Sequence, residues 1–186
     1  MQEVNNILRI LEGTKKAIKH GDTSEMKSLS NQTINTASMT QDPDNIAVAV
    51  IVYSLSKILE RRDYQSLKGW NTFHRIFVSA VERAIQDIKE GSEVKFRKEF
   101  EMINQSIERL SGKLKNYVEE VLRSAKINKA SRIHEHGISL EQTARLLGVS
   151  QYELADYIGR TGISEVPESR TMDSKSRIKL AMELFT

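Results

Sequence analysis

Residues 42–62 read DPDNIAVAVIVYSLSKILERR, and this stretch decides the class of the fold. Asp42 can accept hydrogen bonds from the first backbone N–H groups of a helix, and Pro43 suits the first helical position because its missing N–H needs no partner there. The β-branched run 48–52 would also fit a strand, but the proline start and the continuation through residues 55–60 favour a helix. Its apolar side chains surround most of the circumference, which predicts a helix at the centre of the molecule.

The sequence on either side of this stretch predicts further helices. Apolar residues at helical spacing predict helices over about residues 3–20 and 66–90, and Gly21 is placed to end the first of them. Asp22 followed by Glu25 predicts a capped start for the next helix, whose many hydroxyl and amide side chains we expect to face solvent over most of its surface. Only two prolines and nine glycines occur in 186 residues, and aromatic residues make up 6%, which disfavours an all-β fold.

Residues 96–121 carry the most regular apolar pattern of the chain. Eight apolar residues follow one another at alternating spacings of four and three, which predicts one long helix with a heptad seam. The seam consists of Phe96, Phe100, Ile103, Ile107, Leu110, Leu114, Tyr117 and Val121. Ser111 and Gly112 fall inside it and predict a bend. The seam packs either on the rest of its own chain or on a second copy, as a homodimer.

Composition bounds the kind of protein further. The chain is long enough to bury a core without disulfides or metals, and it contains no cysteine, which excludes disulfides, thiolate zinc sites and cysteine nucleophiles. Its start lacks the pattern of a signal peptide, and its longest apolar-rich run, residues 46–59, is too short to cross a bilayer. We therefore predict a cytoplasmic protein with no membrane association, no cofactor and no bound metal.

The basic excess is concentrated in one segment. The formal net charge of the whole chain is +3, whereas residues 109–132 alone carry seven basic and two acidic side chains. Such a concentration is typical of surfaces that bind polyanions, although a solvated helix face is the alternative. Five cationic or near-cationic residues at helical spacing predict a phosphate-binding stripe there. They are Arg123, Lys126, Lys129, Arg132 and His136.

Residues 138–158 read ISLEQTARLLGVSQYELADYI, which predicts two short helices joined by a turn. Ala144 is small where the two helices would cross, and Gly148 falls at the turn, where a residue must tolerate a positive φ. Ser139 and Ser150 are placed to cap the two helices. Four apolar residues would lock the helices together, namely Leu147, Val149, Leu154 and Ile158.

This pattern resembles the helix-turn-helix of bacterial and archaeal repressors, and the whole chain resembles uncharacterised archaeal all-helical proteins that end in such a motif. The resemblance implies that residues 150–158 enter the major groove of DNA. The candidate contacts are Gln151, Tyr152 and Arg160. Gln151 could bind adenine, and Arg160 could bind a phosphate or guanine. Glu153 and Asp156 depart from the family's habit, because they place negative charge on a helix that would face phosphates.

Two other constellations suggest chemistry. His134 and His136 flank Glu135, but positions i and i+2 of a helix point about 200° apart, so the two imidazoles cannot share a metal ion. The helical ribonucleases of the HEPN class need an arginine and a histidine about five residues apart on one helix. Arg132 and His136 are one residue short of that spacing, so an HEPN-like ribonuclease is the weakest of three hypotheses.

These features predict an all-α protein in three parts. A helical bundle, with the long heptad-patterned helix, spans residues 1–122, a helix-turn-helix unit spans 123–163, and 164–186 hold a loop (167–173) and an amphipathic helix (175–185). The predicted function is a non-enzymatic, homodimeric, nucleic-acid-binding regulator of transcription, with DNA favoured over RNA as its target. The alternatives are an adaptor that binds a protein or a ribonucleoprotein, and the HEPN-like ribonuclease.

Overall fold

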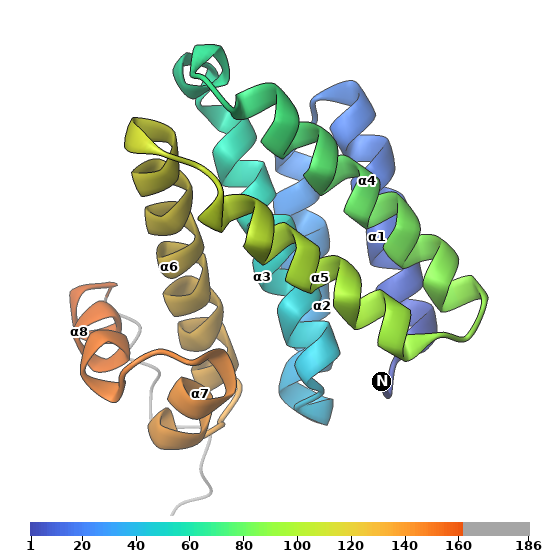
Figure 1. Cartoon of the computed structure of the whole chain (residues 1–186). Helices are drawn as coiled ribbons and strands as arrows, with labels where there is room; N and C mark the ends of the chain where they lie inside the picture. The colour runs from blue at the N-terminus through green and yellow to red at the C-terminus, as the bar shows by residue number, and fades with distance from the viewer. Residues whose placement is uncertain (162–186) are drawn as a thin grey trace, which may run out of the picture.

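The computed structural model describes residues 1–161, and within this range the chain forms eight α-helices, one 3₁₀ helix and no strand (Figure 1). The helices are α1 (Val4–His20), α2 (Thr23–Thr40), α3 (Pro43–Glu60), α4 (Trp70–Lys89), α5 (Glu93–Glu108), α6 (Gly112–Glu135), α7 (Leu140–Leu147) and α8 (Gln151–Thr161), with the 3₁₀ helix η1 (Arg62–Ser66) after α3. This confirms the all-α class. The predicted loop 167–173 and helix 175–185 lie outside the described residues. None of the described helices combines the length and the apolar character that a membrane crossing requires.

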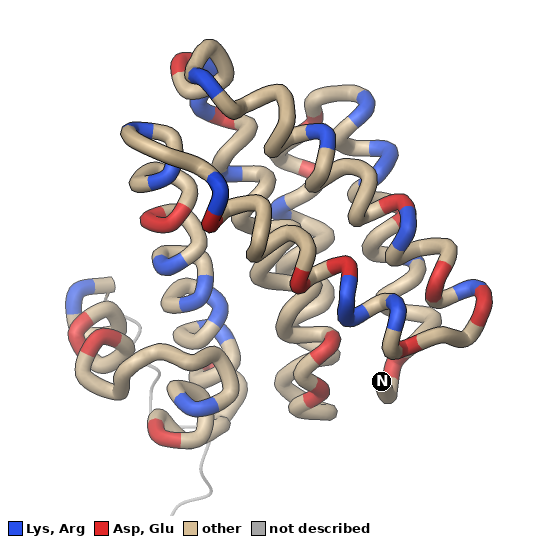
Figure 2. Tube along the Cα trace, viewed as in Figure 1, with Lys and Arg blue, Asp and Glu red and all other residues tan. Residues whose placement is uncertain are grey.

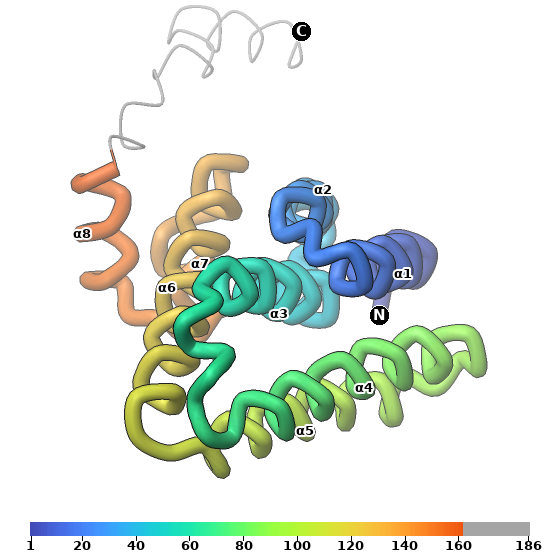
Figure 3. The backbone as a smooth tube through the Cα atoms, turned by 90° about the horizontal axis from the view of Figure 1, so that it is seen from above, coloured from blue at the N-terminus to red at the C-terminus, as the bar shows by residue number. Residues whose placement is uncertain are grey.

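α3 lies at the centre of the molecule, as its all-round apolar sequence predicts. The Asp42 carboxylate accepts a hydrogen bond from the backbone N–H of Asp44 at 3.1 Å, and Pro43 occupies the first turn. Twelve of the eighteen residues of α3 are buried. Seen from above, α1 and α2, the α4–α5 pair, and α6 lie on three sides of this helix (Figure 3). The molecule is therefore built around α3.

α2 corrects one prediction, because it does not face solvent over most of its surface. Seven of its eighteen residues are buried, including several that carry hydroxyl groups. Ser30 is fully buried and donates its hydroxyl hydrogen to the backbone carbonyl of Ala49 on α3 at 2.7 Å. Thr33 donates to the carbonyl of Leu29 one turn earlier. Small hydroxyl side chains can be buried at a helix contact because the backbone satisfies them.

The predicted long helix over residues 96–121 is in fact two helices. α5 ends at Glu108, and α6 begins at Gly112, whose φ of +58° is easily adopted only by glycine. Seam residues on both sides of the break, such as Phe96 and Leu114, belong to the main core of their own chain. The seam is therefore covered by the rest of its own chain, and it is not available to a second copy as the homodimer prediction required.

A second apolar cluster connects α6, α7 and α8 to α2 and α3. Its buried members are Ile34, Ala37, Ile46, Ala49, Val50, Ala125, Ala130, Ile133, Ala144, Leu147, Leu154 and Ile158. α6 also continues without interruption through the domain boundary predicted after residue 122. The C-terminal helices are thus joined to the bundle by a shared core and by the continuous helix α6, whose course Figure 1 shows.

Candidate nucleic-acid interface

The ends of α7 and α8 have the hydrogen bonds that the sequence predicts. Ser139 accepts a hydrogen bond from the backbone N–H of Gln142 at 3.2 Å at the start of α7. Gly148 ends α7 in the left-handed conformation, with φ of +62°. Ser150 Oγ accepts from the backbone N–H of Glu153 at 3.1 Å, while the Glu153 carboxylate accepts from the N–H of Ser150 at 3.3 Å. This reciprocal pair is a capping box, and it fixes where α8 begins.

The packing of α7 and α8 determines which side chains reach solvent. Ala144 is 2% exposed and belongs to the second cluster together with Leu147 of α7 and Leu154 and Ile158 of α8. One face of α8 is therefore covered, and the opposite face is open. Its exposed side chains include Gln151, Tyr152, Asp156 and Arg160. Tyr152 has 82% of its surface exposed.

The basic stripe predicted on α6 is not continuous. Arg123, Lys126, Arg132 and His136 are exposed, but Lys129 is 0% exposed and belongs to the interior. The reason is geometric, because each step of three residues turns about 300° around a helix and a run of such steps drifts away from its starting face. Two steps after Arg123, the drift places Lys129 on the side of α6 that packs against the bundle. The prediction of Lys129 as a phosphate contact is wrong.

Lys129 instead joins three helices. Its Nζ donates a hydrogen bond to Asn31 Oδ1 on α2 at 2.8 Å and lies 4.2 Å from the ring centroid of Tyr53 on α3. It forms no ion pair with an acidic side chain of residues 1–161. Burial, helped by the nearby charge of Arg132, lowers the pKa of Lys129 to about 7.

The charges beside α8 are mostly paired. Arg123 on α6 donates to the Glu153 carboxylate at 2.8 Å, and this bond is the main reason why the pKa of Glu153 is lowered. Arg160 pairs with Asp156 at 2.8 Å along α8 itself. The sequence could not reveal the first pair, because the two residues are thirty positions apart and meet only where α6 and α8 lie side by side. The two negative charges of α8 are thus each neutralised by an arginine.

Four other basic side chains lie near these helices. Arg132 lies 3.6 Å from the Glu135 carboxylate, and it is exposed. His136 donates its Nδ1 hydrogen to the carbonyl oxygen of Arg132 at 2.7 Å, so this ring nitrogen is already bound to its own helix. Lys126 and, on α7, Arg145 are exposed, and neither forms an ion pair within the described part of the chain. Arg145, which the sequence analysis did not single out, therefore joins Lys126 as a cation available to a ligand.

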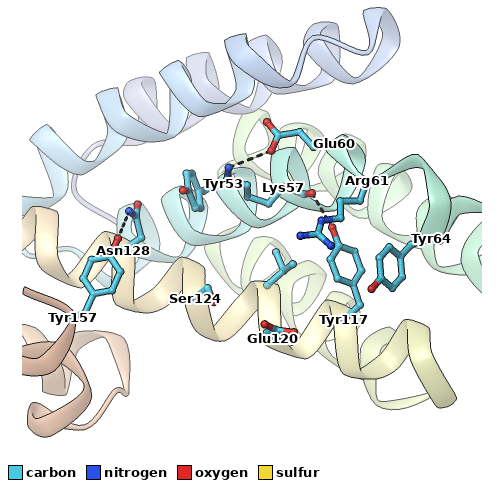
Figure 4. A pocket seen from close by; sticks show the side chains of 11 residues that line it. Tyr53, Lys57, Glu60, Arg61, Tyr64, Tyr117, Glu120, Ser124, Asn128 and Tyr157 are labelled. Atoms are coloured by element: carbon cyan, nitrogen blue, oxygen red, sulfur yellow. Dashed lines mark hydrogen bonds and ion pairs between the residues drawn. The ribbon is translucent and has the colours of Figure 1, made fainter. Parts of the chain in front are cut away.

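A groove of 380 Å³ runs between α3 and α6 and reaches α8 (Figure 4). Four of the five tyrosines of the sequence line it, namely Tyr53, Tyr64, Tyr117 and Tyr157. We call it the tyrosine groove. Asn128 on α6 donates a hydrogen bond to the Tyr157 hydroxyl at 3.1 Å, which connects the groove to α8. Sequence spacing gave no indication of this groove, because its tyrosines come from four separate elements.

The end of the groove away from α8 is a stack of planar groups. The rings of Tyr64 and Tyr117 are stacked, with centroids 3.8 Å apart and an interplanar angle of 15°. Arg61 lies 5.9 Å from the Tyr117 centroid, within the range of a cation–π contact. The Tyr117 hydroxyl donates to the carbonyl of Lys57 at 3.0 Å, and burial raises its pKa, so it stays protonated at neutral pH.

Beyond this stack, five basic residues belong to the α3–α4 and α5–α6 connections or directly flank them. Figure 2 marks the lysines and arginines along both connections. The five are Arg61, Arg62, Lys68, Arg109 and Lys113, and we call this cluster the basic end. All five are exposed, and none forms an ion pair with an acidic side chain of residues 1–161. Lys68 and Lys113 line one shallow hollow, which shows that the two connections are adjacent in space. Asp63 and Glu108 are the acidic residues of the same connections.

Two regions are therefore candidate binding sites: the outer face of α8, and the tyrosine groove with the basic end. α6 contributes side chains to both regions, because Tyr117 and Asn128 line the groove and Arg123 pairs with Glu153 of α8. Comparison with known proteins assigns the chain to no group, since no family model, no curated protein and no solved structure matches it.

Proposed function

We propose that the protein binds nucleic acid through the outer face of α8, in the manner of a helix-turn-helix. The observation that supports this most is the pairing of α7 and α8 around Ala144 and Gly148, which leaves Gln151 and Tyr152 exposed at the start of α8. In repressors with this motif, the first residues of the second helix contact base edges in the major groove. Duplex DNA is the proposed target, and regulation of transcription is the proposed role.

The charges beside α8 set the expected character of this binding. Because Arg123 and Arg160 already pair with Glu153 and Asp156, they add little net positive charge to the face. Lys126 and Arg145 remain for phosphates. Each phosphate contact adds about 0.9 to the slope of log K against log salt for duplex DNA, so two contacts predict a slope near 2.

The same pairing of charges favours one alternative, in which α8 binds a protein. Interfaces between proteins are enriched in tyrosine and depleted of unpaired charge. Tyr152 is exposed on a helix whose acidic side chains are neutralised. An adaptor role for α8 would use the same face, and it differs from the first proposal in having no dependence on a polyanion.

Binding of a labelled duplex to the full chain, followed by fluorescence anisotropy, tests the proposal. Replacing Gln151→Ala together with Tyr152→Ala should weaken binding at least tenfold, because each specific base contact contributes about 1–3 kcal/mol. The control is Asn104→Ala with Gln105→Ala, an adjacent exposed pair on α5, which should leave binding unchanged. Equal affinity for the α8 double variant and the unchanged protein would contradict the proposal.

A further inference from the structure

We infer that the tyrosine groove and the basic end together form a second nucleic-acid surface, one that takes a single-stranded segment. This surface uses none of the residues of the α8 face, so it goes beyond the function proposed above. Two independent observations carry it: a concentration of unpaired cations, and a groove lined by aromatic rings that continues from it.

The basic end has the character of a phosphate-binding surface. Its five cations are exposed, and no described acidic side chain pairs with them, whereas Arg123 and Arg160 beside α8 are both paired. Asp63 and Glu108 offset only part of this charge. Unpaired lysine and arginine side chains attract polyanions because their charge is not already cancelled within the protein.

The tyrosine groove fits single bases and excludes a duplex. It lies between α3 and α6, and neighbouring helices pack with their axes about 8–10 Å apart, which leaves too little width for paired strands. At its end away from α8, the partly exposed ring of Tyr64 stacks on the buried ring of Tyr117, with Arg61 beside the pair. Aromatic rings next to cations are how proteins hold single strands without regard to sequence, and each stacked base contributes about 1–3 kcal/mol.

The two carboxylates that line the groove, Glu60 and Glu120, are compatible with the binding of bases. Glu60 is neutralised, since it pairs with Lys27 and lies 3.2 Å from Lys57. Glu120 is exposed and forms no ion pair within residues 1–161. A free carboxylate repels phosphates and acidic side chains alike, but it accepts hydrogen bonds from the amino groups of bases such as cytosine. Glu120 therefore suits the base side of a strand, whose phosphates the cations of the basic end would bind.

The groove runs along α6 from the basic end toward α8. Tyr117 and Asn128 lie eleven residues apart on α6, which corresponds to about 16 Å of helix. A strand that enters with its phosphates at the basic end would place its bases beside Tyr64 first and would leave near Tyr157. The second surface thus extends from the basic end to the edge of α8 (Figure 4).

Anisotropy titrations of the full chain with labelled single-stranded RNA, single-stranded DNA and duplex DNA, each over a salt series, test this inference. Arg61→Glu with Lys113→Glu should weaken single-strand binding at least tenfold and lower its salt slope by about 1.4, at about 0.7 per phosphate contact. Tyr64→Ala should weaken single-strand binding about tenfold, whereas Tyr64→Phe, which keeps the ring, should bind as tightly as the unchanged protein. The matched control is Lys16→Glu with Lys98→Glu, the same charge change at two exposed sites on α1 and α5 that form no described ion pair.

The outcomes separate this inference from the function proposed for α8. Loss of single-strand binding in the Arg61–Lys113 and Tyr64→Ala variants, with duplex binding unaffected by the α8 changes, supports the second surface and contradicts the first. Single-strand binding that survives both groove variants overturns the inference, even if duplex binding depends on α8. Failure of the unchanged protein to bind any of the three nucleic acids at low salt overturns both, and a protein partner would then be the occupant to seek.

Discussion

Lys129 places its ammonium group in the contact of α6 with α2 and α3, where its partners are an amide oxygen and a tyrosine ring. Water would solvate this charge better than these two groups do, which is why its pKa falls to about 7. Arg132 on α6 is the charged group that acts on Lys129, and Tyr53, whose ring lies beside it, stays protonated because burial raises its pKa, so neither supplies a negative charge at neutral pH. The residue therefore makes stability depend on pH.

We expect the free energy of unfolding to rise between pH 7 and about pH 10. In this range the unfolded chain, with an ordinary lysine pKa of 10.5, binds a proton that folded Lys129 has released, so a higher pH favours the folded state. Lys129→Met keeps the length of the side chain and removes the charge, and it should stabilise the protein by about 1–3 kcal/mol at pH 6. The gain should shrink toward pH 10. Urea unfolding at pH 6, 8 and 10 measures both effects.

Lys126→Met is the matched control, because Lys126 lies on the same helix and is exposed. Its effect on stability should be small and the same at every pH. A stability difference between Lys129→Met and the unchanged protein that does not vary with pH would show that Lys129 remains charged in the folded state throughout.

At the scale of elements, the α7–α8 pair depends on one small residue. Ala144 is 2% exposed, and a larger side chain there would have to displace its neighbours in the second cluster. Ala144→Leu should therefore lower stability by about 1–3 kcal/mol and loosen α8. Thermal unfolding and hydrogen exchange of the α8 amides measure these effects. Ala155→Leu, an exposed site on α8, is the control, and equal behaviour of the two variants would mean that α7 and α8 pack loosely around Ala144.

Local rules predicted where most helices begin and which one is central. The caps at Asp22, Asp42, Ser139 and Ser150 all form, because a cap depends on neighbours within three residues. Periodicity was less informative over residues 96–121. The heptad pattern correctly indicated side chains that are buried, but it could not show that the chain breaks at Ser111 and Gly112, nor that its own core covers the seam. The prediction for α2 is wrong in the opposite direction. Its many hydroxyl groups predict exposure, but several are buried because backbone carbonyls accept their hydrogen bonds.

On the scale of the whole molecule, the two apolar clusters should unfold together. The second cluster takes residues from α2 and α3 as well as from α6, α7 and α8, and α6 also contributes to the main core. The C-terminal helices therefore have no core of their own. We expect one transition in calorimetry, with equal calorimetric and van't Hoff enthalpies. An earlier, separate transition that spares α1–α5 would show that residues 123–161 form an independent domain.

The binding surfaces could be predicted from sequence only in part. A count of charges along the chain correctly located a basic segment, but pairing across space decides which of those charges reach a ligand. Arg123 is cancelled by Glu153, and Lys129 is buried. The basic end, in contrast, collects cations from two connections that are more than forty residues apart, and each connection alone is unremarkable in charge. Only the fold brings them together.

Because α6 is one uninterrupted helix, it fixes the distance between the two binding surfaces. Its 24 residues span about 36 Å, with the basic end at its first turn and α8 beside its middle, where Arg123 contacts Glu153 and Asn128 contacts Tyr157. The basic end and α8 are therefore separated by about 15–22 Å of helix, which is less than one turn of duplex DNA at about 34–36 Å. A short oligonucleotide can reach one surface at a time, whereas a longer molecule with a duplex beside a single-stranded stretch can occupy both at once and gain avidity. A rigid spacer of this kind gives the protein a preference for junctions of a particular geometry, which neither surface would have alone.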